Sequence, residues 1–125
     1  IAIIGFCFGG HAALIASSLK GIDNSFCFYG AGVTTPRTDT NFAPIVLLEK
    51  VSGNLNFICG SADDLIPLKD RLEIKKMFKK FDPLEERFSY IEIEGADHGF
   101  MCEERESFDK DASSIGWNLL MKEFN

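Results

Sequence analysis

The sequence predicts an α/β fold with a parallel sheet covered by helices on both faces, in a three-layer α/β/α arrangement. Strand-like and helix-like segments alternate along the 125 residues, and this alternation is typical of β-α-β units. The first segment, Ile1–Ile4, is apolar on both faces, as expected of a strand buried between helix layers. No internal repeat or linker interrupts the pattern, so we expect a single domain over residues 1–125.

The strands follow from short apolar runs bounded by glycine, proline and polar residues. We predict strands at Ile1–Ile4, Ser25–Tyr29, Asn54–Cys59 and Arg87–Glu94. Side chains alternate along the last of these segments, which indicates a strand near the edge of the sheet.

Helices are expected between these strands. We predict them at His11–Lys20, at Pro44–Val51, at Leu68–Phe81 and from about Glu103 to Phe124. Pro44 suits the first turn of a helix, where a missing N–H costs nothing. Leu68–Phe81 is amphipathic, and its run of Lys75, Lys76, Lys79 and Lys80 marks a solvated face. The connecting loops are expected at Gly30 to about Ala43, Gly60–Pro67 and Gly95–Met101.

The composition and charge of the chain argue against several classes of partner and cofactor. A net charge of −6 and a pI near 4.8 argue against nucleic acid, whose binding depends on basic contacts to phosphate. No apolar run approaches the roughly 20 residues that span a bilayer, so no membrane partner is expected. The four cysteines form no C-x-x-C pair, which favours reduced thiols and a cytoplasmic setting. His98 and Cys102 lack further ligands nearby, so we expect neither a metal nor a cofactor.

Cys7 lies between Gly5 and Gly9, at the junction of the first predicted strand and helix. This G-x-C-x-G pattern is the cysteine form of the nucleophile elbow, a sharp turn that exposes a nucleophile above a sheet. The glycines allow close approach of two chain segments and strained backbone at the nucleophile. The helix N-terminus beside the thiol favours a thiolate. An inert buried thiol is the alternative for Cys7.

Acidic and histidine residues follow two later strands. Asp63 and Asp64 follow Asn54–Cys59, and His98 follows Arg87–Glu94. Ligands bind beyond the carboxyl ends of strands in doubly wound sheets, so these groups are expected near Cys7. Nucleophile, acid and histidine occur in the chain order of α/β-hydrolase triads. The thiolate would attack an acyl carbon, the imidazole would move the proton, and the carboxylate would orient the imidazole. Turn formation by the aspartates and loop packing by His98 are the alternatives.

Together, three motifs resemble those of the dienelactone hydrolase family of α/β hydrolases. They are Gly-Phe-Cys-Phe-Gly-Gly at 5–10, Gly60…Asp63…Pro67, and Ala96-Asp-His-Gly-Phe100. By this resemblance Cys7 is the nucleophile and His98 the base. Asp63 is preferred to Asp64 as the acid, because the family places the acid four residues before the proline. The backbone N–H of Phe8 is then an oxyanion donor. The resemblance implies hydrolysis of lactones or small esters through an acyl-thioester, as in a carboxymethylenebutenolidase.

The resemblance covers most of this chain but only the C-terminal half of such an enzyme. We therefore expect a partial α/β-hydrolase fold that lacks the N-terminal strands, with Ile1–Ile4 beginning in mid-fold. The other half would supply the second oxyanion N–H and the groups that contact substrate and hold the resting thiol. Loss of one oxyanion donor typically costs about 10²–10³ in rate, so this chain by itself is expected to be weak or inactive.

Two other functions stay open. Class I glutamine amidotransferases also place G-x-C-x-G at an elbow, but they pair the cysteine with His-x-Glu, whereas Gly99 and Phe100 follow His98. A catalytically silent α/β domain that self-associates is the other. In a complete α/β hydrolase the elbow strand has a neighbour on each side, whereas Ile1–Ile4 would expose an edge without Lys or Pro to protect it. We therefore expect a homodimer or larger assembly through Ile1–Ile4.

Overall fold

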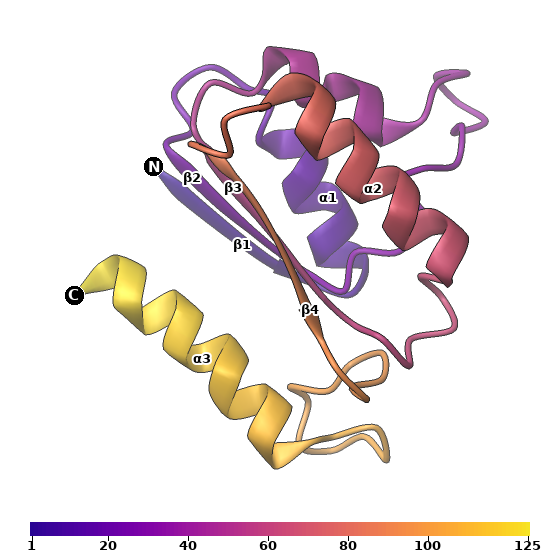
Figure 1. The fold of residues 1–125 in the computed structure, drawn as a ribbon, viewed down its shortest axis with the longest axis vertical. Helices are drawn as coiled ribbons and strands as arrows, with labels where there is room; N and C mark the ends of the chain where they lie inside the picture. The colour runs from indigo at the N-terminus through magenta and orange to yellow at the C-terminus, as the bar shows by residue number, and fades with distance from the viewer.

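The computed structural model describes residues 1–125 and contains a four-stranded parallel sheet in the order β1-β2-β3-β4 (Figure 1). Its strands are β1 (Ala2–Phe6), β2 (Asn24–Phe28), β3 (Asn54–Gly60) and β4 (Phe88–Ile93). Its helices are α1 (Phe8–Ala16), the 3-10 helix η1 (Pro44–Lys50), α2 (Leu68–Phe81) and α3 (Lys110–Phe124). α1 and α2 cover one face of the sheet and α3 covers the other (Figure 1), so the predicted three-layer α/β/α class is confirmed. None of the helices combines the length and apolar character needed to cross a membrane.

The strand register brings the carboxyl ends of the four strands to one edge of the sheet. Phe6 is opposite Phe28, which is opposite Ile58, and Gly60 is opposite Ile93. The two central strands are the most enclosed, and every residue of β2 is buried. Loops that leave this edge therefore start from fixed points close to one another, and they contain Cys7, Asp63 and His98.

An aromatic layer joins the sheet to α3. Phe6 stacks on Phe28 with ring centroids 4.9 Å apart, and Trp117 of α3 lies 6.4 Å from Phe6. Near the other end of the helix, Phe124 lies 6.3 Å from Phe26. Aromatic pairs at these separations contribute about 0.5–1.5 kcal/mol each beyond their buried area. This layer holds α3 against the face opposite α1 and α2.

The predicted bounds of the first helix, His11–Lys20, are wrong at both ends. α1 begins at Phe8 because the Cys7 carbonyl accepts backbone N–H bonds from Gly10 and His11, so helical bonding starts at the elbow itself. α1 ends at Ala16, since the chain then enters a turn in which the Ser17 hydroxyl bonds back to the Leu14 carbonyl. Such local side-chain bonds compete with helix continuation.

The last helix also begins later than the predicted Glu103. Asp109 caps α3, and its carboxylate accepts the backbone N–H of Ala112 at 3.0 Å. The preceding residues form consecutive turns, with the Arg105 N–H bonded to the Cys102 carbonyl and the Phe108 N–H bonded to the Arg105 carbonyl. Arg105 therefore lies in a turn beside the sheet edge rather than on a helix.

Asp82 organises the turn between α2 and β4. Its carboxylate accepts backbone N–H bonds from Glu86, Arg87 and Phe88 at 3.2, 2.8 and 2.7 Å. Burial opposes ionisation of this carboxyl, but the three N–H bonds outweigh burial and hold the pKa of Asp82 below its ordinary value. The charged form of Asp82 therefore stabilises the folded chain.

Replacing Asp82 with asparagine should lower the free energy of unfolding at neutral pH by about 1–3 kcal/mol, because backbone donors lose a charged acceptor. The folded pKa is lowered, so this contribution is present above the unfolded value near 3.9 and is lost as pH falls through the folded pKa. Urea unfolding of both proteins as a function of pH measures the difference. Asp64→Asn, at an exposed carboxylate, is the control. An equal loss at all pH values would contradict the role of the charge.

Candidate active site

The turn at Cys7 is strained in the way a nucleophile elbow requires. Cys7 has φ 56° and ψ −122°, an unfavourable combination for a residue with a side chain, which typically costs about 1–3 kcal/mol. A Cβ on Gly5 would lie 1.9 Å from the Gly9 carbonyl oxygen, so only glycine allows the helix start to fold back onto the strand end. The Cys7 N–H bonds to the Phe28 carbonyl at 3.1 Å, which ties the turn to β2.

The N-terminus of α1 begins directly at Cys7. Cys7 is the N-cap of α1, and Phe8 is its first residue, where a backbone N–H has no acceptor within the helix. The half-buried Cys7 contrasts with Cys27 and Cys59, which are fully buried. Burial raises the pKa of Cys59 to about 11 and that of Cys27 further, so those thiols stay protonated. Cys7 is the thiol with both access and a helix N-terminus beside it.

His98 and Asp63 are in direct contact. His98 Nδ1 lies 2.8 Å from Asp63 Oδ2, and the carboxylate is fully buried. An ionised carboxylate only accepts hydrogen bonds, so Nδ1 carries the proton and Nε2 keeps a lone pair. The other oxygen, Oδ1, accepts the Leu65 N–H at 2.9 Å. This tautomer leaves Nε2 able to accept a proton.

Backbone contacts hold the Asp63 and His98 loops together. The Ala62 N–H bonds to the Ala96 carbonyl at 3.0 Å, and the Ser61 N–H bonds to the Ile93 carbonyl at 3.0 Å. A Cβ on Gly60 would lie 2.0 Å from the Ala96 carbonyl oxygen, so this close approach requires glycine. The distance between carboxylate and imidazole is therefore set by the ends of β3 and β4.

Asp64, the second aspartate considered as the acid, is exposed and makes no contact with His98. Between the two aspartates, the structure places only Asp63 against the imidazole.

The hydrogen bond to the Cys7 sulfur comes from Arg105 and not from His98. Arg105 Nη1 lies 3.5 Å from Cys7 Sγ. The ring of Tyr29 joins the same group, with its centroid 5.2 Å from that of His98. Burial first, and then the neighbouring charge of Cys7, raise the pKa of Tyr29 to about 12. The phenol therefore stays neutral and does not repel a thiolate.

Arg105 was not among the residues expected from the sequence. The helix predicted from Glu103 placed it on a helix surface, whereas it lies in the turn that precedes α3. Its position seven residues after His98, on the loop from the same strand end, is the signal that could have found it.

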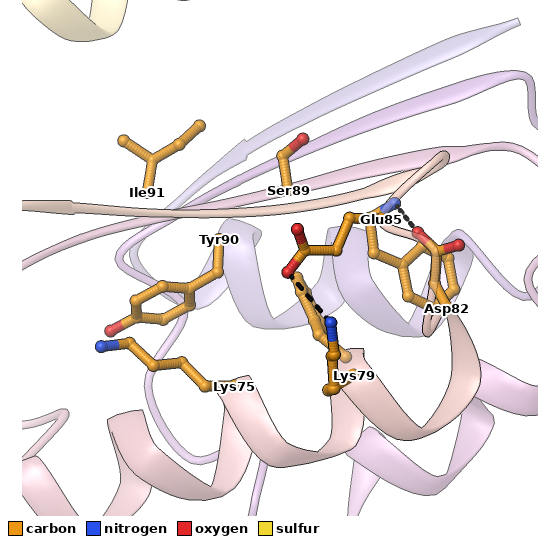
Figure 2. Close-up of a pocket in the computed structure, with 9 residues that line it drawn as sticks. Lys75, Lys79, Asp82, Glu85, Ser89, Tyr90 and Ile91 are labelled. Carbon is orange, nitrogen blue, oxygen red and sulfur yellow. Dashed lines mark hydrogen bonds and ion pairs between the residues drawn. The ribbon is translucent and has the colours of Figure 1, made fainter.

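His98 and Arg105 line an open cavity of about 480 Å³, with Leu65, Asp97, Glu106 and Ser107. A larger cavity of about 690 Å³ lies between α2 and β4 and contains none of Cys7, Asp63 and His98. Figure 2 shows this second cavity, where Lys79 reaches Glu85 at 3.7 Å and Lys75 lies beside Tyr90. Of these two cavities, only the one of about 480 Å³ is lined by His98 and by Arg105, whose guanidinium reaches Cys7, so it is the candidate active site. No cluster of His, Cys, Asp and Glu side chains is placed to hold a metal ion.

Comparison with known families decides the assignment. The model of the dienelactone hydrolase family matches residues 1–125. The chain belongs to the dienelactone hydrolase family. This assignment decides against the glutamine amidotransferase group and confirms the resemblance drawn from the elbow, the Asp63 loop and the His98 loop.

Two curated relatives of this dienelactone hydrolase family member support the family assignment. A Synechocystis protein named "Putative carboxymethylenebutenolidase" is 33% identical over 124 residues, which cover 99% of this chain and 49% of the relative. A Bradyrhizobium protein named "Probable 2-oxo-3-(5-oxofuran-2-ylidene)propanoate lactonase" is 29% identical over 119 residues, covering 94% of this chain and 47% of the relative. The chain thus spans about half the length of the curated relatives it matches.

Solved structures share the fold. The crystal structure of a "Putative Dienelactone Hydrolase" from Klebsiella pneumoniae superposes with a TM-score of 0.87 at 18% identity, over 97% of this chain and 50% of that one. A dienelactone hydrolase-like promiscuous phosphotriesterase from metagenomic libraries gives 0.76 at 18% identity, over 98% of this chain and 50% of that one. The sheet and helices described above are therefore those of an α/β hydrolase.

Proposed function

We propose that this chain carries the catalytic triad of a carboxylic ester or lactone hydrolase, with Cys7 as nucleophile, His98 as base and Asp63 as orienting acid. The observation that carries the proposal is the 2.8 Å bond between His98 Nδ1 and the buried Asp63 carboxylate, on loops at the same sheet edge as the strained Cys7 turn. The family assignment supports the same reaction class.

The proposed reaction has two halves. In the first, His98 Nε2 takes the thiol proton, and the Cys7 sulfur attacks the carbonyl carbon. The carbon–oxygen bond of the ester then breaks, the leaving alkoxide takes the proton from His98, and an acyl-thioester remains on Cys7. In the second, His98 takes a proton from water, the resulting hydroxide attacks the thioester, the carbon–sulfur bond breaks, and the departing sulfur takes the proton back from His98 to restore the thiol. Asp63 holds the imidazole tautomer throughout and stabilises its cation.

Two donors could stabilise the charge that develops in this reaction. We propose the Phe8 N–H as one oxyanion donor, because Phe8 is the first residue of α1 and its N–H has no acceptor within the helix. Arg105 donates to the sulfur at 3.5 Å and would stabilise the thiolate before attack. A second oxyanion N–H is not among these groups, and its loss typically costs about 10²–10³ in rate.

The substrate class follows from the curated relatives, one named as a carboxymethylenebutenolidase and one as a lactonase. We therefore expect unsaturated lactones and small activated esters as substrates.

Hydrolysis of such compounds tests the proposal. An aryl ester and an enol lactone are each incubated with the purified chain and with the chain extended by the coding sequence that precedes Ile1 in its reading frame. We expect turnover by the extended protein and weak or no turnover by residues 1–125 alone, because an oxyanion donor is lacking. Absence of turnover by the extended protein would contradict the hydrolase, and would favour the catalytically silent, self-associating domain.

We also propose that residues 1–125 self-associate through β1. This edge strand pairs only with β2, and its side chains Ile4 and Phe6 are 43% and 37% accessible, while Ile1, which precedes it, is 75% accessible. Unprotected apolar edges recruit further strands. Two copies that pair their β1 edges across a two-fold axis would form one continuous sheet with a self-complementary interface.

Sedimentation equilibrium of residues 1–125 at several concentrations tests the assembly. We expect a homodimer or larger species whose population rises with concentration. Replacement of Ile4 by lysine should weaken the association, because it charges the exposed edge. A monomer at all concentrations would refute the proposal, and addition of the preceding segment as a second chain would show whether it occupies the edge instead.

A further inference from the structure

A buried polar network connects α2 and β4 to the turn that carries Asp63. Arg71 of α2 donates through Nε to Glu92 Oε1 at 3.1 Å and through Nη1 to the Ile66 carbonyl at 2.9 Å. The Tyr90 hydroxyl donates to the same Glu92 oxygen at 2.6 Å. Arg71 is 8% accessible, so its guanidinium is held in place with little freedom to exchange partners for water.

Ile66, whose carbonyl accepts a hydrogen bond from Arg71, closes the turn that begins at the candidate acid Asp63. The Ile66 N–H bonds to the Asp63 carbonyl at 3.1 Å, while the Ile66 carbonyl accepts from Arg71 at 2.9 Å. Within the same turn the Leu65 N–H bonds to Asp63 Oδ1 at 2.9 Å. A movement of this turn would therefore change the direction of the carboxylate that faces His98.

The protonation states of Glu92 and Tyr90 favour the hydrogen bonds of this network. The hydrogen bond from Tyr90 and the positive charges of Arg71 and Lys75 hold the pKa of Glu92 below its ordinary value despite burial. Burial raises the pKa of Tyr90, so the phenol remains a donor. Figure 2 shows the Tyr90 ring beside Lys75. None of these side chains contacts Cys7 or His98, so their effect on the site must pass through the Asp63 turn.

We propose that Arg71 is a positioning residue for Asp63: anchored on Glu92, it fixes the Asp63–Ile66 turn so that the carboxylate keeps its bond to His98 Nδ1. The proposal rests on the proposed function for its catalytic consequence, but the contact that it explains is present whether or not the chain is an enzyme. Positioning errors of about 1 Å remote from the chemistry can cost about 10²-fold in rate, so the effect is measurable.

Two variants distinguish an effect on the position of the Asp63 turn from an effect on the stability of the fold. Arg71→Met removes both donors but leaves Glu92 without its cation, which destabilises the fold. The double variant Arg71→Met with Glu92→Met removes the whole ion pair, and such replacements are often neutral or stabilising. It therefore keeps the folded state while releasing the Ile66 carbonyl. Lys79→Met, at an exposed position of the same helix, is the matched control.

The direct readout is the proton resonance of His98 Nδ1–H in a histidine-¹⁵N-labelled chain, assigned by its loss in Asp63→Asn. We expect the resonance in the wild type and in Lys79→Met, and its loss or displacement in the double variant at unchanged unfolding midpoint.

In the extended protein we expect kcat to fall by about 10- to 100-fold in the double variant with KM little changed. An unaltered resonance and unaltered kcat in the folded double variant would overturn the positioning role. A wild type that shows the resonance but hydrolyses neither ester nor lactone would overturn the proposed function only, and the resonance of the double variant would still decide the role of Arg71.

Discussion

Cys7→Ala should abolish ester and lactone turnover by the extended protein, with kcat falling by about 10⁴- to 10⁶-fold, because no other group can form the acyl intermediate. Substrate binding should persist, since alanine removes only the sulfur and leaves the Phe8 N–H and the elbow glycines in place. Steady-state kinetics with an aryl ester measure the loss.

Cys102→Ala is the matched control for the nucleophile, because Cys102 is an exposed thiol on a loop at this end of the sheet. We expect its turnover to equal that of the wild type. Residual turnover in Cys7→Ala comparable to the wild type, or loss of turnover in Cys102→Ala, would remove Cys7 from the mechanism.

Asp63→Asn should lower kcat by about 10⁴-fold, because the amide can donate to Nδ1 and so force the proton of His98 onto Nε2. The imidazole would then be unable to accept the thiol proton. Asp64→Asn, one residue away and exposed, should leave turnover intact. Kinetics of both variants across the pH range measure the effect. Equal losses of kcat in the two variants would mean that turnover depends on the negative charge of this loop and not on the bond between Asp63 and His98.

The elbow could be predicted from sequence because its determinants are local. Gly5 and Gly9 flank Cys7 within five residues, and the steric need for glycine at Gly5 arises from contact with Gly9 itself. The alternation of strands and helices likewise follows from short-range periodicity. Parallel pairing in chain order then places the three strand-end loops together without further information.

The helix ends could not be predicted as well, because they depend on particular hydrogen bonds. The first helix was predicted to continue to Lys20, yet α1 ends at Ala16, where the Ser17 hydroxyl bonds back to the Leu14 carbonyl. At the other end of the chain, the Asp109 cap decides where α3 starts. Because the last helix was predicted to begin too early, Arg105 was assigned to a helix and was not expected near Cys7. Its contact with Cys7 joins residues 98 positions apart.

The choice between Asp63 and Asp64 could be made from the family spacing to Pro67, and the structure places Asp63 against the imidazole. The difference in burial between these two neighbouring residues arises from the packed loop and could not be predicted from the residues alone. The Arg71 network could not be read from sequence for the same reason, because its partners come from α2, the Asp63 turn and β4.

Peptide mass spectrometry of the acyl intermediate tests the central claim most directly. The extended protein is mixed with an aryl ester, quenched in acid within one turnover, and digested for peptide mapping. The account predicts a mass increase equal to the acyl group on the peptide that contains Cys7, its absence in Cys7→Ala, and its accumulation in Asp63→Asn to a lower level at the same quench time. Turnover with no acyl group on Cys7, or with the acyl group on another residue, would contradict it.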